Sequence, residues 1–122
     1  MLLYTVKIKV LPTNRTINTE CPYWLEISKE KGQYEIKVRE EDNTIKELYF
    51  KSISQVKIIF SHFIHKYRKS DIWFKADISY CNSLFNLSDN SLVERHYTSV
   101  SNIDDFKDRI MTNLDEIGIL TQ

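Results

Sequence analysis

The stretch SISQVKIIFSHFIHKY, residues 52–67, decides the fold. Its apolar residues recur every three or four positions, which places them on one side of an α-helix packed against a core. Ser52 followed by Gln55 resembles a capping box, which satisfies free amide groups where a helix begins. A helix is therefore predicted to start here and to end at Ser70 and Asp71, with a buried stripe of Val56, Ile59, Phe60, Phe63, Ile64 and Tyr67.

The residues before this helix alternate between apolar and polar, which indicates β-strands. Four such segments precede the helix, at residues 4–10, 23–28, 34–39 and 45–50. Pro12 is expected to end the first strand, because proline has no amide proton to donate to a ladder. Residues 13–22 are then expected to form a polar loop. Gly32 supplies the positive φ that a tight hairpin needs, and residues 41–43 make a second turn.

After the helix, residues 72–80 predict a strand and residues 92–100 a weaker one. Residues 81–91 are predicted to be a loop, under which Leu84, Phe85 and Leu87 tuck. The order β-β-β-β-α-β-(β)-α predicts a single α+β domain over residues 1–122. Its sheet is mostly antiparallel, and its two helices pack on one face.

A second amphipathic helix is predicted near the end of the sequence. Ser101 or Asn102 caps its start, and acidic residues in its first turn suit the helix dipole. Gly118 fits a left-handed cap at its C-terminal end. Its buried stripe consists of Ile103, Phe106, Ile110, Leu114 and Ile117.

The composition excludes several classes of enzyme. Two glycines among 122 residues are too few for a phosphate-binding loop, a dinucleotide fingerprint or a nucleophile elbow. Lys plus Arg (17) equals Asp plus Glu (17), so net charge favours neither nucleic acid nor an anionic membrane. The first residues alternate too strictly for a signal peptide, and no apolar stretch approaches the ~20 residues of a membrane span. We expect a cytoplasmic protein with no cofactor, whose cysteines, Cys21 and Cys81, are reduced thiols.

The first helix carries basic residues and histidines but no carboxylate, whereas the last helix is mainly acidic. One interpretation is that the basic helix faces an acidic partner or a nucleic-acid backbone. The other is a solvated helix face whose cations suit the dipole at its C-terminal end. His62 and His65 share a helix face, but a metal site needs a further ligand, so no metal is expected. The candidate partner-binding residues here are His62, His65, Lys66 and Lys69, and a nucleic acid would use Lys57, Lys66, Arg68 and Lys69.

A second candidate surface is aromatic. If the apolar positions of residues 23–28 and 72–80 face the helices, then Trp24 and Trp73 face away from them, beside Glu26, Lys75 and Asp77. Tryptophan among mixed charges is typical of interface hot spots. The alternatives are that loops 11–22 or 81–91 cover these side chains, or that nucleic-acid bases stack on them.

An enzyme would need other residues. His96, next to Glu94 and Arg95, has the chemistry of a general acid or base, and Cys81 that of a nucleophile beside a histidine. No motif surrounds either residue. No catalytic residue is therefore assigned, and a non-enzymatic protein is predicted.

In profile, with no motif behind it, the chain resembles small bacterial or phage inhibitor and immunity proteins, which act by masking another protein. The leading hypothesis is a protein-binding module that blocks a toxin or effector by occlusion, as a monomer or homodimer. The tryptophan face or the basic helix would make contact, whereas a basic toxin nuclease would instead meet the acidic last helix and the turn at residues 40–42. A nucleic-acid or nucleotide-binding module that uses the basic first helix is the alternative. A small enzyme that uses His96 or Cys81 is the second alternative.

Overall fold

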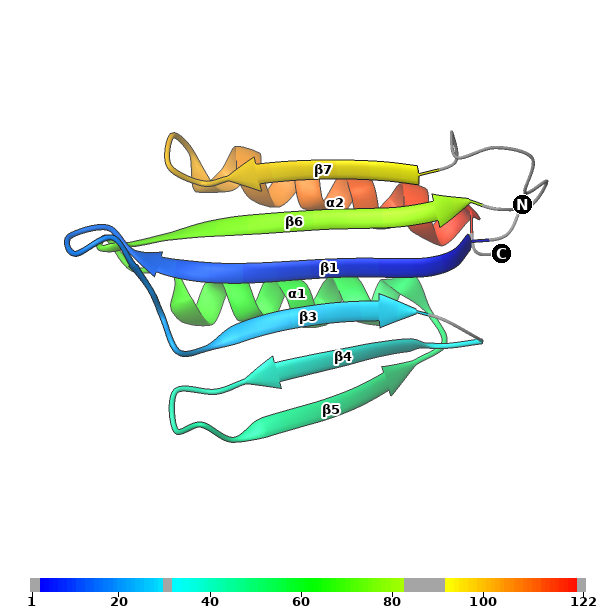
Figure 1. Ribbon diagram of the computed structural model, residues 1–122, viewed down its shortest axis with the longest axis horizontal. Helices are drawn as coiled ribbons and strands as arrows, with labels where there is room; N and C mark the ends of the chain where they lie inside the picture. Colours follow the sequence, from blue (N-terminus) through cyan, green and yellow to red (C-terminus); the bar gives the residue numbers. More distant parts are fainter. Residues whose placement is uncertain (1–2, 30–31, 83–91, 121–122) are drawn as a thin grey trace.

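The described part of the chain, residues 3–29, 32–82 and 92–120 of a computed structural model, folds into one antiparallel sheet backed by two helices (Figure 1). This arrangement confirms the predicted α+β class with both helices on one face. Leu84, Phe85 and Leu87 of the predicted loop lie outside the described residues. The elements are β1 (Leu3–Asn14), β2 (Thr19–Glu20), β3 (Trp24–Lys29), β4 (Tyr34–Arg39), β5 (Ile45–Phe50), α1 (Ile53–Tyr67), β6 (Ile72–Asn82), β7 (Leu92–Thr98) and α2 (Ile103–Leu120).

The first strand lies in the middle of the sheet. The spatial order is β5-β4-β3-β1-β6-β7, and the short β2 pairs with the end of β1. The ladder between β1 and β6 runs from Leu3 opposite Asn82 to Asn14 opposite Ile72. To reach β6 the chain crosses from β5 at one edge to the far side of β1, and α1 makes this crossing behind the sheet (Figure 1).

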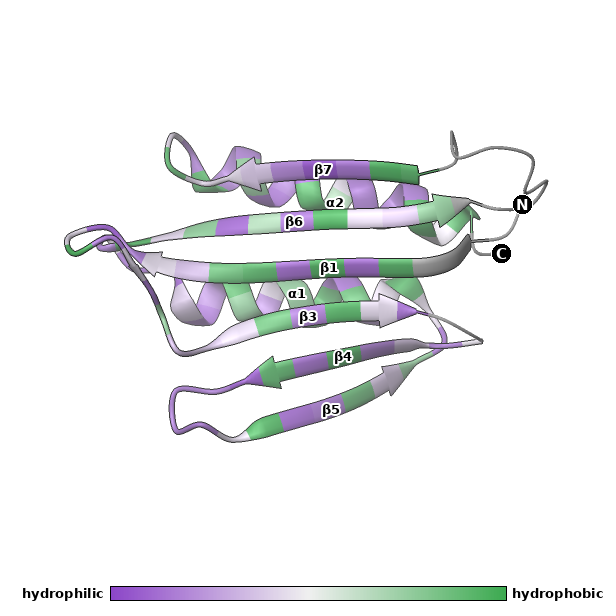
Figure 2. Cartoon of the chain, in the orientation of Figure 1, coloured by the Kyte–Doolittle hydropathy of each residue, from purple (hydrophilic) through white to green (hydrophobic). Residues whose placement is uncertain are grey.

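The core lies between the sheet and the helices. Hydrophobic and hydrophilic residues alternate in bands along the strands (Figure 2). The strand side chains that face the helices are mostly hydrophobic, and Arg95 of β7, which bonds to Asn113 and Glu116 of α2, is an exception. Aromatic rings cross this layer in contact with one another: Tyr23 stacks on Tyr67 at 4.1 Å between ring centroids, and Phe74 stacks on Phe106 at 6.1 Å. The largest fully buried side chains come from both layers, which ties each helix to the sheet: Tyr34, Tyr67, Phe60, Phe74 and Phe106.

The predicted end of the first strand at Pro12 is wrong, because β1 continues through it to Asn14. The Pro12 carbonyl accepts from the Cys21 amide at 2.9 Å, away from β6. A residue's amide and carbonyl point the same way in an antiparallel pair, so the missing amide proton is not one that the β6 ladder needs. The predicted 13–22 loop is therefore shorter: it contains β2, which pairs with Thr13 and Asn14.

Both predicted helix starts are confirmed at the level of single hydrogen bonds. Ser52 caps α1 by accepting from the Ser54 amide at 3.1 Å. Of the two candidates for α2, Asn102 is the cap: its side-chain oxygen accepts from the amides of Asp104 and Asp105 at 2.9 and 3.1 Å. Gly32 has the positive φ expected of it, 76°.

Gly118 is not the helix cap predicted from the sequence. It lies inside α2, buried and without a positive φ, against the first turn of α1. A Cβ placed on Gly118 would lie 2.5 Å from Cγ2 of Ile53. The glycine therefore allows the two helices to approach closely, a tertiary requirement that a helix-end pattern cannot distinguish from a cap.

We predict that Gly118→Ala lowers the free energy of unfolding, by about 1–3 kcal/mol. In a helix without this contact, alanine would be more stable than glycine by about 0.5–1 kcal/mol. Chemical denaturation of the wild type, Gly118→Ala, Ile53→Ala and the double variant measures the coupling. In the Ile53→Ala background, which lacks both γ-carbons but keeps a Cβ 3.0 Å from the added methyl group, the cost of Gly118→Ala should be smaller. A stabilising Gly118→Ala in the wild type would contradict the close contact.

Candidate functional site

The predicted binding residues fall on two opposite faces of the molecule. Trp24, Trp73 and Lys75 lie on the sheet face that points away from the helices, here called the open face, as the strand alternation predicts. His62, His65 and Lys66 lie on α1, and Lys69 follows that helix. The structure therefore brings the first three residues together and separates them from the other four.

A row of alternating charge crosses the middle of the open face. Cross-strand neighbours in this charged row are opposite in sign wherever both carry full charge. Lys9 and Glu26 form an ion pair at 3.4 Å, and Nδ1 of His96 is hydrogen-bonded to Asp77 at 2.6 Å. The charged row consists of Glu47, Lys37, Glu26, Lys9, Asp77 and His96. Exposed pairs of this kind add little stability, but they leave the centre of the face nearly neutral.

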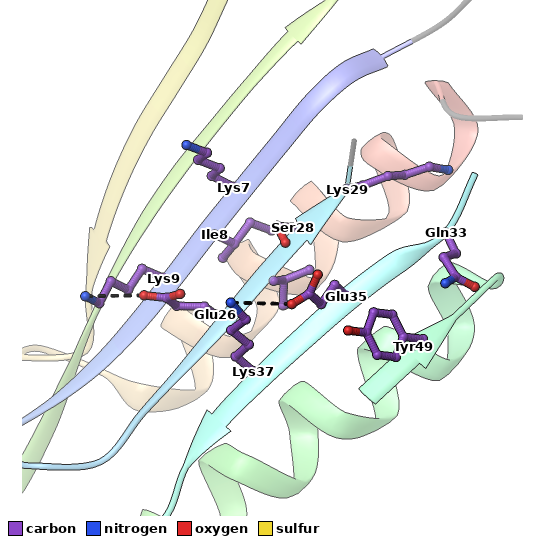
Figure 3. A pocket seen from close by; sticks show the side chains of 11 residues that line it. Lys7, Ile8, Lys9, Glu26, Ser28, Lys29, Gln33, Glu35, Lys37 and Tyr49 are labelled. Atoms are coloured by element: carbon purple, nitrogen blue, oxygen red, sulfur yellow. Dashed lines mark ion pairs between the residues drawn. The ribbon is translucent and has the colours of Figure 1, made fainter. Parts of the chain in front are cut away.

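A wide hollow of about 740 Å³ lies beside the charged row, over β1, β3 and β4 (Figure 3). Lys9 and Lys37 line it, each paired with a glutamate that also lines it; the Lys37–Glu35 distance is 3.5 Å. The hollow thus combines both signs of charge and is open to solvent, with Tyr49 at its rim (Figure 3). Lys7 and Lys29 also line the hollow, so four lysines and two glutamates surround it and the charge of its lining favours an anion over a cation.

One end of the open face differs from the rest, and we call it the tryptophan end: Leu11, Thr13, Trp24, Arg39, Trp73 and Lys75. Cross-strand register places Trp73 opposite Thr13 and Trp24 opposite Arg39. The β1–β3 ladder stops one residue short of Leu11 and Trp24, so β1 passes between the two indoles. Lys9 and Lys75 hold their ammonium groups 5.7 and 6.0 Å from the Trp24 and Trp73 ring centroids. The tryptophan end thus combines aromatic rings with cations, and the register places Glu20 of β2 directly opposite Thr13 on the same face.

Both indoles are half-buried. Residues 11–14 of the expected covering loop belong to β1 and so lie beside the indoles rather than over them. The other expected cover, loop 81–91, lies outside the described residues from position 83 onward.

The tryptophan end also holds unsatisfied hydrogen-bonding groups. Among the described residues, two buried side-chain atoms have no hydrogen-bond partner, Oγ1 of Thr13 and Nε of Arg39. Thr13 is 4 % exposed, and Arg39 donates through Nη2 to Oδ1 of Asn43 at 3.0 Å. Buried polar atoms are nearly always paired in folded proteins, so two exceptions at one end of one face form a distinct feature. No sequence pattern indicates it.

On the helix side of the molecule, most charged side chains form ion pairs within the protein. Three of the basic residues predicted to meet a partner or nucleic acid are ion-paired: Lys57 with Asp115, Lys66 with Glu40 and Arg68 with Asp104. On α2, Asp105 pairs with Arg109 and Glu116 pairs with Arg95. Because α1 and α2 lie side by side, the charge separation seen in the sequence is largely cancelled in space. Lys51 and Lys69 take part in no ion pair within the described part of the chain.

The remaining candidate residues are dispersed. His62 and His65 are exposed on α1, and within residues 3–29, 32–82 and 92–120 no three His, Cys, Asp or Glu side chains are placed to hold a metal ion. His96 bonds to Asp77, but its side chain is 72 % exposed. Cys81 lies opposite Leu92, four positions along β7 from His96, or about 13 Å at strand spacing. The structure therefore does not place the candidate nucleophile beside the candidate base.

Sequence reasoning missed a carboxylate that ties the sheet to α1. Glu40, which follows β4, accepts hydrogen bonds at 2.8 Å from Nζ of Lys66 and from the Tyr67 hydroxyl, and lies 3.5 Å from Nζ of Lys46. Its side chain is only 16 % exposed. Hydrogen bonds from Lys66 and Tyr67 hold the pKa of Glu40 below its ordinary value of 4.5. Lys66, predicted to bind a partner, is thus occupied within the fold.

We predict that Glu40→Gln lowers stability at pH 7 and that this loss shrinks in acid. A carboxyl group whose pKa is lower in the folded state stabilises fully above its unfolded pKa, near 4.5. Its contribution is lost as the pH falls through the folded pKa. Urea unfolding of wild type and variant from pH 7 to pH 3 should therefore give converging free energies below about pH 4.5. Glu41→Gln, which removes the same charge from an exposed neighbour, is the control, and a pH-independent gap for Glu40→Gln would contradict the linkage.

We predict that Thr13→Val raises the free energy of unfolding by about 1 kcal/mol, because it replaces an unpartnered buried hydroxyl with a methyl group of similar shape. Thr13→Ser keeps the hydroxyl, removes the methyl group and should destabilise. Chemical denaturation of both variants tests the pair. If Thr13→Val destabilises as well, the hydroxyl has an acceptor or donor in solution.

No protein family, curated protein or solved structure matches this chain. In the described residues, no helix has the length and apolar character needed to cross a membrane. The two faces described above are therefore the grounds on which a function can be proposed.

Proposed function

We propose that this chain is a non-enzymatic protein-binding module of the inhibitor or immunity type, which blocks a toxin or effector protein by covering its active site. The observation that carries the proposal is the tryptophan end of the open face. Tryptophan and arginine are the residues most enriched among interface hot spots, where they supply large contact areas at small entropic cost. Here two tryptophans and an arginine share one end of one sheet face.

The sheet beneath the tryptophan end supports a rigid mode of binding. Trp24 and Trp73 project from paired strands on either side of β1, so cross-strand pairing fixes their backbone positions. A preformed surface loses little conformational entropy when it binds, which favours tight occlusion of a partner. No bound substrate, metal or moving catalytic loop is required for this activity.

The helix side supports the same choice of face. Its ion pairs already neutralise Lys57, Lys66 and Arg68, so a nucleic acid would have to displace an internal carboxylate from each. A cytoplasmic location is part of the proposal, since neither Cys21 nor Cys81 forms a disulfide among the described residues, as is usual in a reducing compartment.

The test begins with affinity capture from the source cell, using the wild type and the double variant Trp24→Ala/Trp73→Ala. We expect the wild type to retain one protein in a complex that can be reconstituted from purified components, and the double variant to lose it. Addition of the wild type should abolish the partner's activity at a 1:1 ratio, as occlusion requires. Circular dichroism and thermal melts establish that the double variant is folded.

His62→Ala/His65→Ala is the matched control, because it removes two exposed aromatic side chains from the opposite layer. This variant should retain the partner. Loss of binding in the histidine variant but not in the tryptophan variant would contradict the proposed face. Salt-sensitive capture of RNA or DNA that weakens when Lys66 and Lys69 are reversed in charge would instead support the nucleic-acid alternative.

A further inference from the structure

We propose that a cavity at one end of the molecule binds a doubly charged phosphate group, either free or carried by a small molecule. The cavity has a volume of about 450 Å³. It lies where three connections meet at the same end of the sheet: the residue after β1, residues 68–70 between α1 and β6, and residues 99–103 at the start of α2 (Figure 1). Its polar lining includes three cations and three serines: Arg15, Arg68, Lys69, Ser70, Ser99 and Ser101. This phosphate cavity goes beyond the proposed function and does not depend on it.

The phosphate cavity collects positive charge without acid. None of the described residues that line it is acidic, whereas two glutamates line the hollow on the open face and hold two of its lysines in ion pairs. Arg68 is paired with Asp104 at 3.3 Å, but Arg15 and Lys69 form no ion pair among the described residues. Asp71 lies outside the lining; its backbone carbonyl accepts from the Arg15 amide at 2.7 Å, and its carboxylate forms no ion pair in the described part of the chain. Two cations of the phosphate cavity are therefore left without a counter-ion.

Two uncompensated cations match the charge of a phosphate group. A phosphate monoester carries about −1.5 to −2 at pH 7, whereas a carboxylate carries a single charge and would leave one cation unpaired. Arginine binds phosphate oxygens through two parallel N–H groups, and lysine adds a point charge. The serines supply hydroxyl donors. Oγ of Ser99 accepts from the Phe74 amide at 2.7 Å, which leaves its proton available for an anion.

Side chains, rather than the helix start, carry this argument. The side-chain oxygen of Asn102 already accepts from the amides of Asp104 and Asp105, and its carbonyl accepts from the Phe106 amide. These amides of the first turn of α2 are therefore not available to a ligand. The affinity for phosphate should accordingly depend on individual cationic side chains.

The phosphate cavity and the tryptophan end lie on opposite sides of the sheet. Ile72, which lines the cavity, is a core residue on the helix-facing side of β6. Trp73, the next residue along the strand, lies on the open face. A phosphate group in the cavity would therefore not cover the indoles, and the two surfaces can be tested separately.

The experiment is a titration of the intact ¹⁵N-labelled protein followed by amide chemical shifts, at constant ionic strength and at pH 8, where phosphate monoesters are doubly ionised. The probes are AMP, inorganic phosphate, adenosine and acetate. We expect AMP and inorganic phosphate to give saturable shifts at residues 15, 68–70 and 99–103. Adenosine should leave these amides unchanged, and acetate should bind at least about tenfold more weakly than phosphate. Tighter binding of AMP than of inorganic phosphate assigns the cavity to an organic phosphate, and equal affinities assign it to the free ion.

Variants of exposed cations test the site in the same titration. Arg15→Gln and Lys69→Gln should each weaken AMP about tenfold, because each removes a charged hydrogen-bond donor. Lys51→Gln is the matched control: Lys51 is also an exposed lysine without an ion pair among the described residues, but it precedes the opposite end of α1. A helix of 15 residues separates the two lysines by roughly 22 Å, well beyond the Debye length of about 8 Å at physiological salt. The control should change the affinity less than about twofold.

Several results would overturn the inference. They are the absence of saturable shifts with either phosphate probe, shifts centred on the open-face hollow, acetate binding as tight as phosphate binding, and equal effects of Lys69→Gln and Lys51→Gln. An oligo-dT strand that binds far more tightly than AMP would show that the cavity takes a nucleic-acid backbone instead of a small ligand. Trp24→Ala/Trp73→Ala should bind AMP as the wild type does. Loss of the captured protein partner in that variant, with AMP binding retained, would show that the two surfaces act independently.

Discussion

The central position of β1 is the constraint on which the rest of the structure depends. Besides the short β2, its partners are β3, which follows it closely, and β6, which is reached only after two further strands and a helix. Because β5 is at one edge and β6 lies beyond β1, the intervening helix must cross behind the sheet. That crossing buries one face under α1, and α2 covers the same side next to β7 (Figure 1). The open face is therefore a consequence of where the first strand pairs.

The same arrangement determines where charge is left uncompensated. Side-by-side packing of α1 and α2 pairs a basic helix with an acidic one, and antiparallel register pairs lysine with carboxylate across the open face. Near-zero net charge is thus matched by local neutrality over much of the surface. The tryptophan end brings two indoles together with Arg39 and Lys75, neither of which forms an ion pair among the described residues, and Glu20 lies opposite Thr13 at its edge. Charged side chains that already form ion pairs within the fold are therefore weaker candidates for a binding surface than those that do not.

Local patterns in the sequence predict the elements well, and tertiary contacts account for what they miss. Alternation predicts the strands and the outward direction of Trp24 and Trp73, while short-range chemistry predicts the caps at Ser52 and Asn102. Pro12 does not end the strand, because the amide proton that it lacks would point away from β6. That direction depends on which strands lie beside β1, and the local sequence does not reveal them. Gly118 is not a helix cap. Its lack of a side chain lets Ile53, which is 65 positions away in sequence, pack against the helix backbone. The Glu40 cluster is missed for the same reason, since a strand end and a helix end meet only after folding.

Thr13 and Arg39 are the two described residues that bury a side-chain polar atom without a hydrogen-bond partner. Proteins depart from local rules of polar satisfaction mainly at functional sites, where a binding partner completes the interaction. Both departures occur beside a tryptophan, on adjacent parts of one surface, and not in the helix-facing core, where the described residues pack apolar and aromatic groups. A random flaw in packing would have no reason to coincide with the half-buried indoles and with cations that form no ion pair among the described residues. This coincidence of three independent features makes the tryptophan end, rather than the larger hollow beside it, the most informative surface of the molecule.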